Sequence, residues 1–155
     1  MTSGLKDKDN ETRELNRSVV QKFFEIDFEK VSTLFTEDGV KIIPWYPQKP
    51  AIWRGRDAIH KNGVSNKELF AGWKYDKIEI YGTDDPNHFW VLCNGSGEQF
   101  IKGAPKVYSN SYVLSFLLQD GLIKEFKEFF SPLGLYESLG IDVPPTPMPT
   151  PFATD

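Results

Sequence analysis

The sequence predicts one α+β domain, in which three N-terminal helices pack on a strongly curved antiparallel sheet that encloses a small-molecule pocket. The 155 residues are a typical length for one domain. Apolar residues near the N-terminus recur with helical spacing, whereas four β-rich segments follow one another in the second half. Helices followed by consecutive strands favour an antiparallel meander over alternating βαβ units.

Three segments predict the helices. From Thr12 onward, apolar residues line one side of a helix and charged residues interrupt the other side. The segment FEKVSTLF (28–35) predicts a second, short helix, and RGRDAIHKNGVSNKELF (54–70) a third. The apolar face of the first helix comprises Leu15, Val19, Val20, Phe23 and Phe24.

The flanking segments predict the domain boundaries. Residues 1–10 are polar and are expected to be disordered, so the domain spans 11–143. Residues 144–155 are rich in proline and are expected to form an extended C-terminal tail.

The strands follow from runs of β-forming residues between turn signals. Pro44 within VKIIPWYP (40–47) predicts an edge strand or a bulge there, and PAIWRG (50–55) is a second short strand. Four longer segments predict the meander: KIEIYG (77–82), HFWVLCNGSGEQF (88–100), VYSNSYVLSFLL (107–118) and LIKEFKEFF (122–130).

The segment HFWVLC (88–93) is apolar on both faces. Phe89 and Val91 alternate with Trp90 and Leu92, so one face can cover the helices while the other needs a partner. We therefore expect a homodimer with a two-fold interface.

Composition and charge exclude several classes of partner. The net charge is −4 and Lys and Arg form no cluster, so we expect no nucleic acid. No apolar run approaches the roughly 20 residues that span a bilayer, and the N-terminal residues lack the apolar core of a signal peptide. The one cysteine, Cys93, cannot form an internal disulfide. These features predict a cytoplasmic protein that does not bind membranes.

The last predicted hairpin carries the most informative pattern. Even-numbered positions of 108–118 are large and mostly aromatic, whereas odd-numbered positions are small and largely polar. A two-residue loop at Asp120 and Gly121 would pair even positions with odd ones, and a three-residue loop that includes Gln119 would pair even with even. Since register follows the hydrophobic pattern, we predict the three-residue loop.

This register places Glu128 on the aromatic face with Tyr112, Phe126 and Phe130, on the same side as Tyr108. A carboxylate among rings loses solvation, which raises its pKa toward neutrality and suits a general acid or base. The alternative is an ordinary glutamate, paired with a lysine or exposed at the rim of the sheet.

Several blocks of the sequence resemble the phenazine-biosynthesis A/B proteins: LFTEDGV (34–40), RGRDAI (54–59), DDPNHFWVLCNGSG (84–97), DGLIKEFKEFFSP (120–132) and SLGIDVP (138–144). Those proteins belong to a superfamily of cone-shaped, cystatin-like α+β folds, with nuclear transport factor 2, the SnoaL-type polyketide cyclases and ketosteroid isomerase. The resemblance implies this fold and a dimer. It also implies an acid/base condensation of two amino-oxo-cyclohexene carboxylic acids into a tricyclic skeleton, with no cofactor and no metal.

The resemblance nominates Glu128 as the proton shuttle and Tyr108 as a residue that contacts the substrate. Three positions depart from the family pattern, because Asn62 and Asn66 stand where it has His and Ser, and Val31 where it has Arg. Imidazole carries a proton near pH 7 and a carboxamide does not.

Two hypotheses follow from these departures. The first is an enzyme in which Glu128 transfers protons while Tyr108, Asn62, Asn66, Tyr112 and Phe126 bind a small cyclic carboxylic acid. The second is a protein on the same fold that binds a ligand without catalysis, or that acts as a cyclase or isomerase on another substrate.

Overall fold

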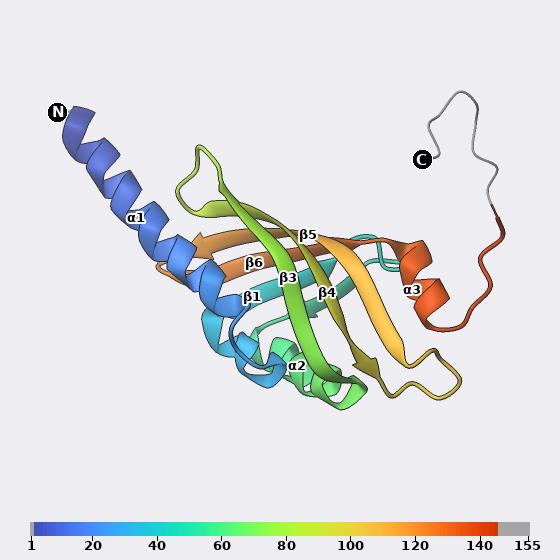
Figure 1. Ribbon diagram of the computed structural model, residues 1–155. Coiled ribbons are helices and arrows are strands. Elements are labelled where there is room, and N and C mark those ends of the chain that lie inside the picture. Colours follow the sequence, from blue (N-terminus) through green and yellow to red (C-terminus); the bar gives the residue numbers. More distant parts are fainter. Residues whose placement is uncertain (1, 146–155) are drawn as a thin grey trace, which may run out of the picture.

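The computed structural model describes residues 2–145, which form helices packed on one six-stranded sheet (Figure 1). The elements in chain order are α1 (Thr2–Phe23), the 3₁₀ helix η1 (Phe28–Leu34), β1 (Phe35–Ile43), β2 (Ala51–Arg54), α2 (Arg56–Leu69), β3 (Phe70–Gly82), β4 (His88–Gln99), β5 (Val107–Gln119), β6 (Leu122–Phe130) and α3 (Pro132–Ser138). The prediction of an α+β architecture with N-terminal helices is confirmed.

The sheet is mixed, which corrects the prediction of an antiparallel sheet. Its strand order is β2-β1-β6-β5-β4-β3, and the predicted meander from β3 to β6 is antiparallel throughout. However, β1 runs parallel to β6, because α2 carries the chain to the far edge of the sheet and the meander returns beside β1. The sheet is also not strongly curled, contrary to the expectation (Figure 1).

Pro44 lies outside the strands. β1 ends at Ile43, one residue before the proline, and it occupies an interior position of the sheet. The edge on this side is β2, which pairs with β1 through four residues. Neither the edge strand nor the bulge predicted for residues 40–47 is found, since the pairing of residues 40–43 is continuous. Pro44 ends the strand because it has no N–H to donate.

The ends of the chain differ from the sequence prediction in two ways. α1 begins at Thr2 and continues through residues that we expected to be disordered, and this exposed part contains no proline to end it. In Figure 1 it projects beyond the sheet. α3 was not predicted; Ser131 caps it by accepting a hydrogen bond from the Gly134 N–H at 3.2 Å, and Pro132 begins it. Most of the proline-rich tail lies outside the described residues.

The β5–β6 hairpin pairs even positions with even ones, as predicted: Tyr112 lies opposite Phe130 and Phe116 opposite Phe126. The turn, however, contains two residues. Asp120 and Gly121 have φ of 52° and 77°, the positive values that a type I′ turn requires. A bulge next to the turn leaves Lys124 without an opposite residue and restores the even pairing.

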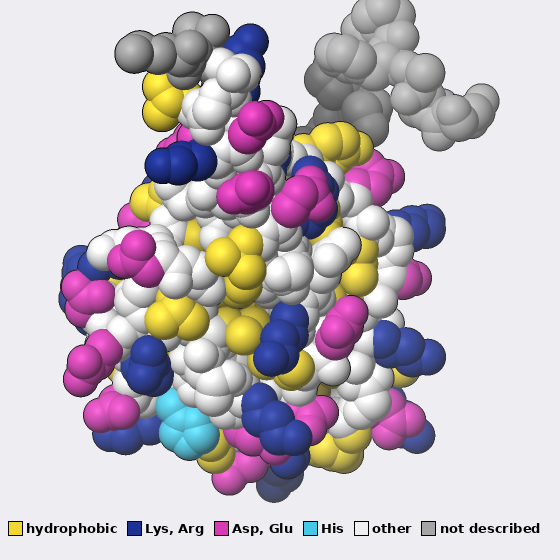
Figure 2. Space-filling view, turned by 90° about the vertical axis from the view of Figure 1, so that its left-hand side faces the viewer, with side chains coloured by type: hydrophobic (Ala, Val, Ile, Leu, Met, Phe, Trp, Pro, Cys, Tyr) yellow, Lys and Arg dark blue, Asp and Glu magenta, His cyan; other side chains and the backbone are white. Residues whose placement is uncertain are grey.

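The two faces of β4 have different surroundings. Phe89, Val91 and Cys93 point into the core and are buried, whereas Trp90 and Leu92 on the other face are 37% and 43% exposed. On the side of the molecule in Figure 2, acidic and basic side chains are interspersed, with hydrophobic side chains between them. Within residues 2–145, no helix is long and apolar enough to cross a membrane.

Candidate functional site

A cavity of about 960 Å³ lies between the helices and the inner face of the sheet. This volume is at the upper end of the range typical of small-molecule sites. Aromatic side chains from β3, β5 and β6 form much of its wall. All six residues that the sequence nominated line the cavity: Glu128, Tyr108, Tyr112, Phe126, Asn62 and Asn66. Their roles remain predictions.

Glu128 lies on β6, where its neighbours on the same face, Phe126 and Phe130, are buried rings. The surface that Glu128 still exposes faces the cavity. Within residues 2–145, no side chain forms a hydrogen bond or an ion pair with its carboxylate. Burial raises the pKa of Glu128, and the charge of Lys41 offsets part of this effect. The carboxylate is therefore free to contact a bound molecule.

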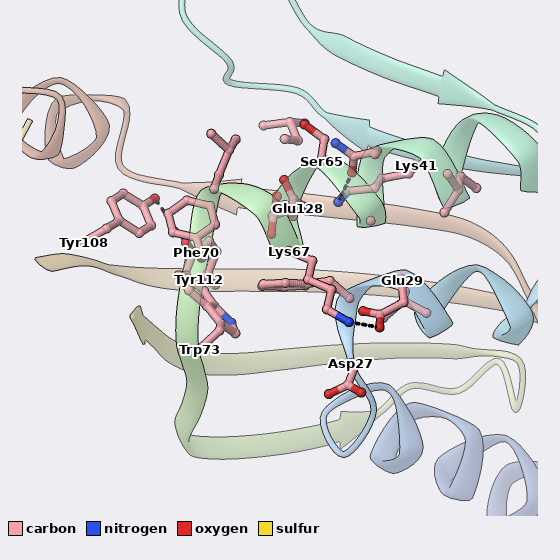
Figure 3. Close-up of a pocket in the computed structure, with 18 of the residues that line it drawn as sticks. Asp27, Glu29, Lys41, Ser65, Lys67, Phe70, Trp73, Tyr108, Tyr112 and Glu128 are labelled. Atoms are coloured by element: carbon pink, nitrogen blue, oxygen red, sulfur yellow. Dashed lines mark hydrogen bonds and ion pairs between the residues drawn. The ribbon is translucent and has the colours of Figure 1, made fainter. Parts of the chain in front are cut away.

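Lys41 is a site residue that the sequence analysis missed. It lies on β1 beside Phe126 of β6, and its Nζ donates a hydrogen bond to Asn62 Oδ1 at 2.8 Å (Figure 3). The ammonium is 5.3 Å from the centroid of the Trp53 ring and 5.9 Å from that of Phe126, so it lies against two aromatic faces. Burial lowers the pKa of Lys41, and the negative charge of Glu128 partly opposes this. We call Lys41, Glu128 and Asn62 the charged end of the cavity.

A second group of residues, which we call the tyrosine end, comprises Tyr108, Tyr112, Asn110 and Trp73. Tyr112 Oη donates to Tyr108 Oη at 3.1 Å, and Asn110 Nδ2 donates to the same oxygen at 3.3 Å. The Trp73 ring stacks on Tyr108 with centroids 5.8 Å apart. Burial raises the pKa of both tyrosines, so both hydroxyls stay protonated.

α2 positions the two asparagines. Asn62 and Asn66 are one turn apart and both face the cavity. Gly63 allows α2 to pack closely on η1, because a Cβ at this position would lie 2.3 Å from the Phe28 carbonyl oxygen. Val31, where the family pattern has arginine, also lines the cavity and brings no charge to it.

An ion pair lies at another part of the cavity wall. Lys67 on α2 donates to the Glu29 carboxylate on η1, and this contact lowers the pKa of Glu29 (Figure 3). The charge of Lys67 is therefore already balanced. Among the described residues, no group of three His, Cys, Asp or Glu side chains could hold a metal ion.

Comparison with known proteins identifies the family. The model of the family described as "Phenazine biosynthesis protein A/B" matches residues 1–148. The chain belongs to the phenazine biosynthesis protein A/B family. Phenazine biosynthesis protein PhzB1 of Pseudomonas aeruginosa is 38% identical over 141 residues, which cover 87% of this chain and 86% of that protein. The family resemblance inferred from the sequence is thereby confirmed.

Solved structures agree with this assignment. The crystal structure of a phenazine biosynthesis-related protein, PhzB2 of Pseudomonas aeruginosa, superposes with a TM-score of 0.87 and 33% identity, covering 96% of this chain and 99% of that one. A nuclear transport factor 2-like protein from Burkholderia xenovorans has a TM-score of 0.66 and 18% identity over 81% of this chain and 96% of its own. The latter likeness shows the fold alone, which is nuclear transport factor 2-like.

The sequence pattern contained one signal for the missed lysine. Lys41 is the only charged residue in the run VKII (40–43), and a lone lysine between apolar strand residues is unusual for a buried strand. The sequence predicts an edge strand or a bulge in this segment and assigns no role to its lysine. Its actual partner strand, β6, begins about 80 residues further along the chain, so local alternation could not reveal the contact.

Proposed function

We propose that this phenazine A/B family member is an acid–base catalyst that condenses two small cyclic amino-oxo carboxylic acids, with Glu128 transferring the protons. The observation that carries the proposal is the position of Glu128, which faces a large aromatic cavity without a hydrogen-bond partner among the described residues. The names of the relatives, which are phenazine biosynthesis proteins, supply the reaction class.

The proposed chemistry needs proton transfer and no cofactor. The amine of one molecule attacks the ketone carbon of the other, and the resulting carbinolamine loses water to form an imine. Glu128 moves two protons in turn from the amine nitrogen to the ketone oxygen. The first gives the carbinolamine hydroxyl and the second converts that hydroxyl into the departing water, so the carboxylate ends each transfer as it began. Burial raises the pKa of Glu128, which favours a group able to hold and release a proton near neutral pH.

The test is turnover of an amino-oxo-cyclohexene carboxylic acid, followed by mass spectrometry of the tricyclic product. Glu128→Gln keeps the shape and one acceptor but cannot exchange a proton, so we expect a loss of about 10²–10⁴-fold. Glu125→Gln is the matched control, because Glu125 is on the same strand but faces the other side and pairs with Lys127 at 3.2 Å. Unchanged turnover in Glu128→Gln would refute the assignment.

The second candidate function is ligand binding without catalysis. It is favoured by Asn62 and Asn66, which replace His and Ser of the family pattern and can form hydrogen bonds but cannot transfer protons. The double variant Asn62→His with Val31→Arg restores the two missing ionisable groups. A rise in condensation rate would show that these departures limit catalysis. Binding of the acid without turnover, in the wild type and in this variant, would favour the second function.

We further propose that the protein is a cytoplasmic homodimer that joins through the outer face of the sheet. The exposed apolar residues Trp90, Leu92 and Val113 lie on adjacent strands, β4 and β5, on the face opposite the cavity. Such a face gains stability when a second copy covers it. Light scattering at micromolar concentration should give twice the chain mass of 17.7 kDa, and Leu92→Lys should shift the protein toward monomer.

A further inference from the structure

We propose that Lys41 is the anion-binding residue of the cavity, and that it holds the carboxylate of the ligand beside Glu128. The ligand class rests on the proposed function. The choice of residue does not, because it rests on the contacts and position of Lys41 in the cavity. Lys41 differs from the other lysines of the cavity in its free hydrogen-bond donors and in its surroundings.

The ammonium of Lys41 has N–H donors that form no hydrogen bond with the described residues. An ammonium group has three N–H donors, and within residues 2–145 its Nζ donates only to Asn62 Oδ1. No carboxylate of the described residues lies within ion-pair distance of it, and its nearest charged influence is Glu128. A buried cation in this situation gains free energy from an anion that brings its own charge.

The other lysines of the cavity wall are poorly suited to this role. The cavity is lined by Lys41, Lys67 and Lys74. Lys67 is paired with Glu29, and Lys74 lies on an exposed position of β3. Lys41 alone combines a deep position with the lack of an ion-pair partner among the described residues, so a ligand that reaches Glu128 also reaches Lys41.

The arrangement selects a particular kind of ligand. The carboxylate would receive the free donors of Lys41, and the attached ring would lie against Phe126 and Trp53, the two rings beside the ammonium. Glu128, which also lines the cavity, would then face a polar substituent elsewhere on the same ring. The Lys41 side chain extends into the cavity from β1. The family pattern instead places an arginine at the position of Val31, on η1. The ligand carboxylate would therefore bind at a different wall of the cavity in this chain.

The experiment compares a carboxylate with its neutral analogue. Isothermal titration calorimetry would measure the affinity of cyclohex-1-ene-1-carboxylate and of the matching carboxamide. A charge-assisted hydrogen bond predicts about 10–100-fold preference of the wild type for the acid. Lys41→Met should remove this preference and Lys41→Arg should retain most of it. Lys67→Met, which removes a lysine that is already paired, should leave the preference unchanged.

Two further measurements separate the possible failures. Glu128→Gln should keep the preference for the acid even if it abolishes turnover. The turnover assay therefore tests the role of Glu128, and the preference for the acid separately tests the role of Lys41. In the wild type, the NMR titration of the Lys41 side chain should move to higher pH when the acid binds and not when the amide binds, a result that needs no variant to fold. Retention of the preference in Lys41→Met, or equal or no binding of the two compounds by the wild type, would overturn the proposal.

Discussion

The two ends of the cavity are built differently. At the tyrosine end, the hydroxyls of Tyr108 and Tyr112 bond to each other and Asn110 adds a further donor, so both hydroxyls have partners within the protein, and only the Trp73 Nε1–H lacks one among the described residues of this end. At the charged end, Glu128 has no hydrogen-bond partner among the described residues, and Lys41 uses one of three donors. Both ends are surrounded by rings, so the difference lies in polar bonding and not in the apolar wall.

This difference assigns separate tasks to the two ends. A buried polar group with unused hydrogen-bonding capacity costs free energy, so the protein gains when a ligand bonds both to the Glu128 carboxylate and to the free donors of Lys41. The hydroxyls of the tyrosine end already have their bonds, and this end serves as a fixed wall that shapes the ligand. The charged end is where bonds to the ligand form, and its residues come from β1, β6 and α2, which are far apart in the sequence.

The largest expected effect on stability is at the charged end, in Gly63→Ala. The added methyl group would meet the backbone carbonyl of Phe28, which cannot rotate away, so α2 must shift from η1 and carry Asn62 with it. Overpacking of this kind costs about 1–3 kcal/mol in the free energy of unfolding. Urea unfolding measures this loss, and calorimetry should show a weaker preference for the acid over the amide.

Gly4→Ala is the control for this change. It is also a glycine within a helix, but a Cβ there meets nothing within 4 Å. Alanine should therefore leave the protein as stable or stabilise it by up to about 1 kcal/mol. If Gly63→Ala were as stable as Gly4→Ala, the close contact between α2 and η1 would not position Asn62.

A smaller effect is expected in the pH dependence of stability. Burial raises the pKa of Glu128 above its ordinary value of 4.5, so the folded protein holds a proton that the unfolded chain releases. The stability from this group is present below pH 4.5 and is lost as pH rises through the raised pKa. Stability of the wild type relative to Glu128→Gln should therefore fall as pH increases above 4.5, as measured by urea unfolding at several pH values.

The tyrosines and the cysteine near Glu128 titrate above this window, and Lys41 is present in both of the proteins that are compared. Burial raises the pKa of Tyr75, Tyr112 and Cys93, and that of Cys93 reaches about 12. Lys41 changes in the opposite sense, because its lowered pKa adds stability only as pH rises toward its ordinary value of 10.5. A constant difference between wild type and Glu128→Gln from pH 4 to 8 would contradict the placement of a buried, unpartnered carboxylate.

The smallest effect should come from the tyrosine end, in Tyr112→Phe. The change removes the hydrogen bond to Tyr108, but Tyr108 still receives the bond from Asn110, so no buried acceptor loses all its partners. We expect a loss of about 0.5–1.5 kcal/mol in the free energy of unfolding. The preference for acid over amide should not change. If it fell as far as in Lys41→Met, the two ends would not have separate tasks.

The sequence predicted the site residues of β5 and β6 better than the one on β1, for a physical reason. Alternation along 108–118 and 122–130 is a local pattern, so it showed that Tyr108, Tyr112, Phe126 and Glu128 share a face. The pairing of even with even positions was predicted from a three-residue loop. In the structure it results from a two-residue turn and a bulge at Lys124.

The charged end depends on contacts that local patterns do not record. The parallel pairing of β1 with β6 places Lys41 beside Phe126, and the packing of α2 brings Asn62 to the same ammonium. Pro44 predicted an edge strand or a bulge, which gave no indication that Lys41 faces a cavity. The family pattern showed that Val31 stands where an arginine is expected. The absence of a charge at Val31 gave no indication that Lys41 brings a charge to the same cavity.

The most direct test of the account is a crystal structure of the protein with cyclohex-1-ene-1-carboxylate bound. We predict one molecule at the charged end, with its carboxylate on Lys41 Nζ at a hydrogen-bond distance of roughly 3 Å. Its ring should lie against Phe126 and extend toward Glu128, while the bonds between Tyr108, Tyr112 and Asn110 stay as they are. A carboxylate bound at the tyrosine end, or at Lys67 with Glu29 displaced, would contradict the account.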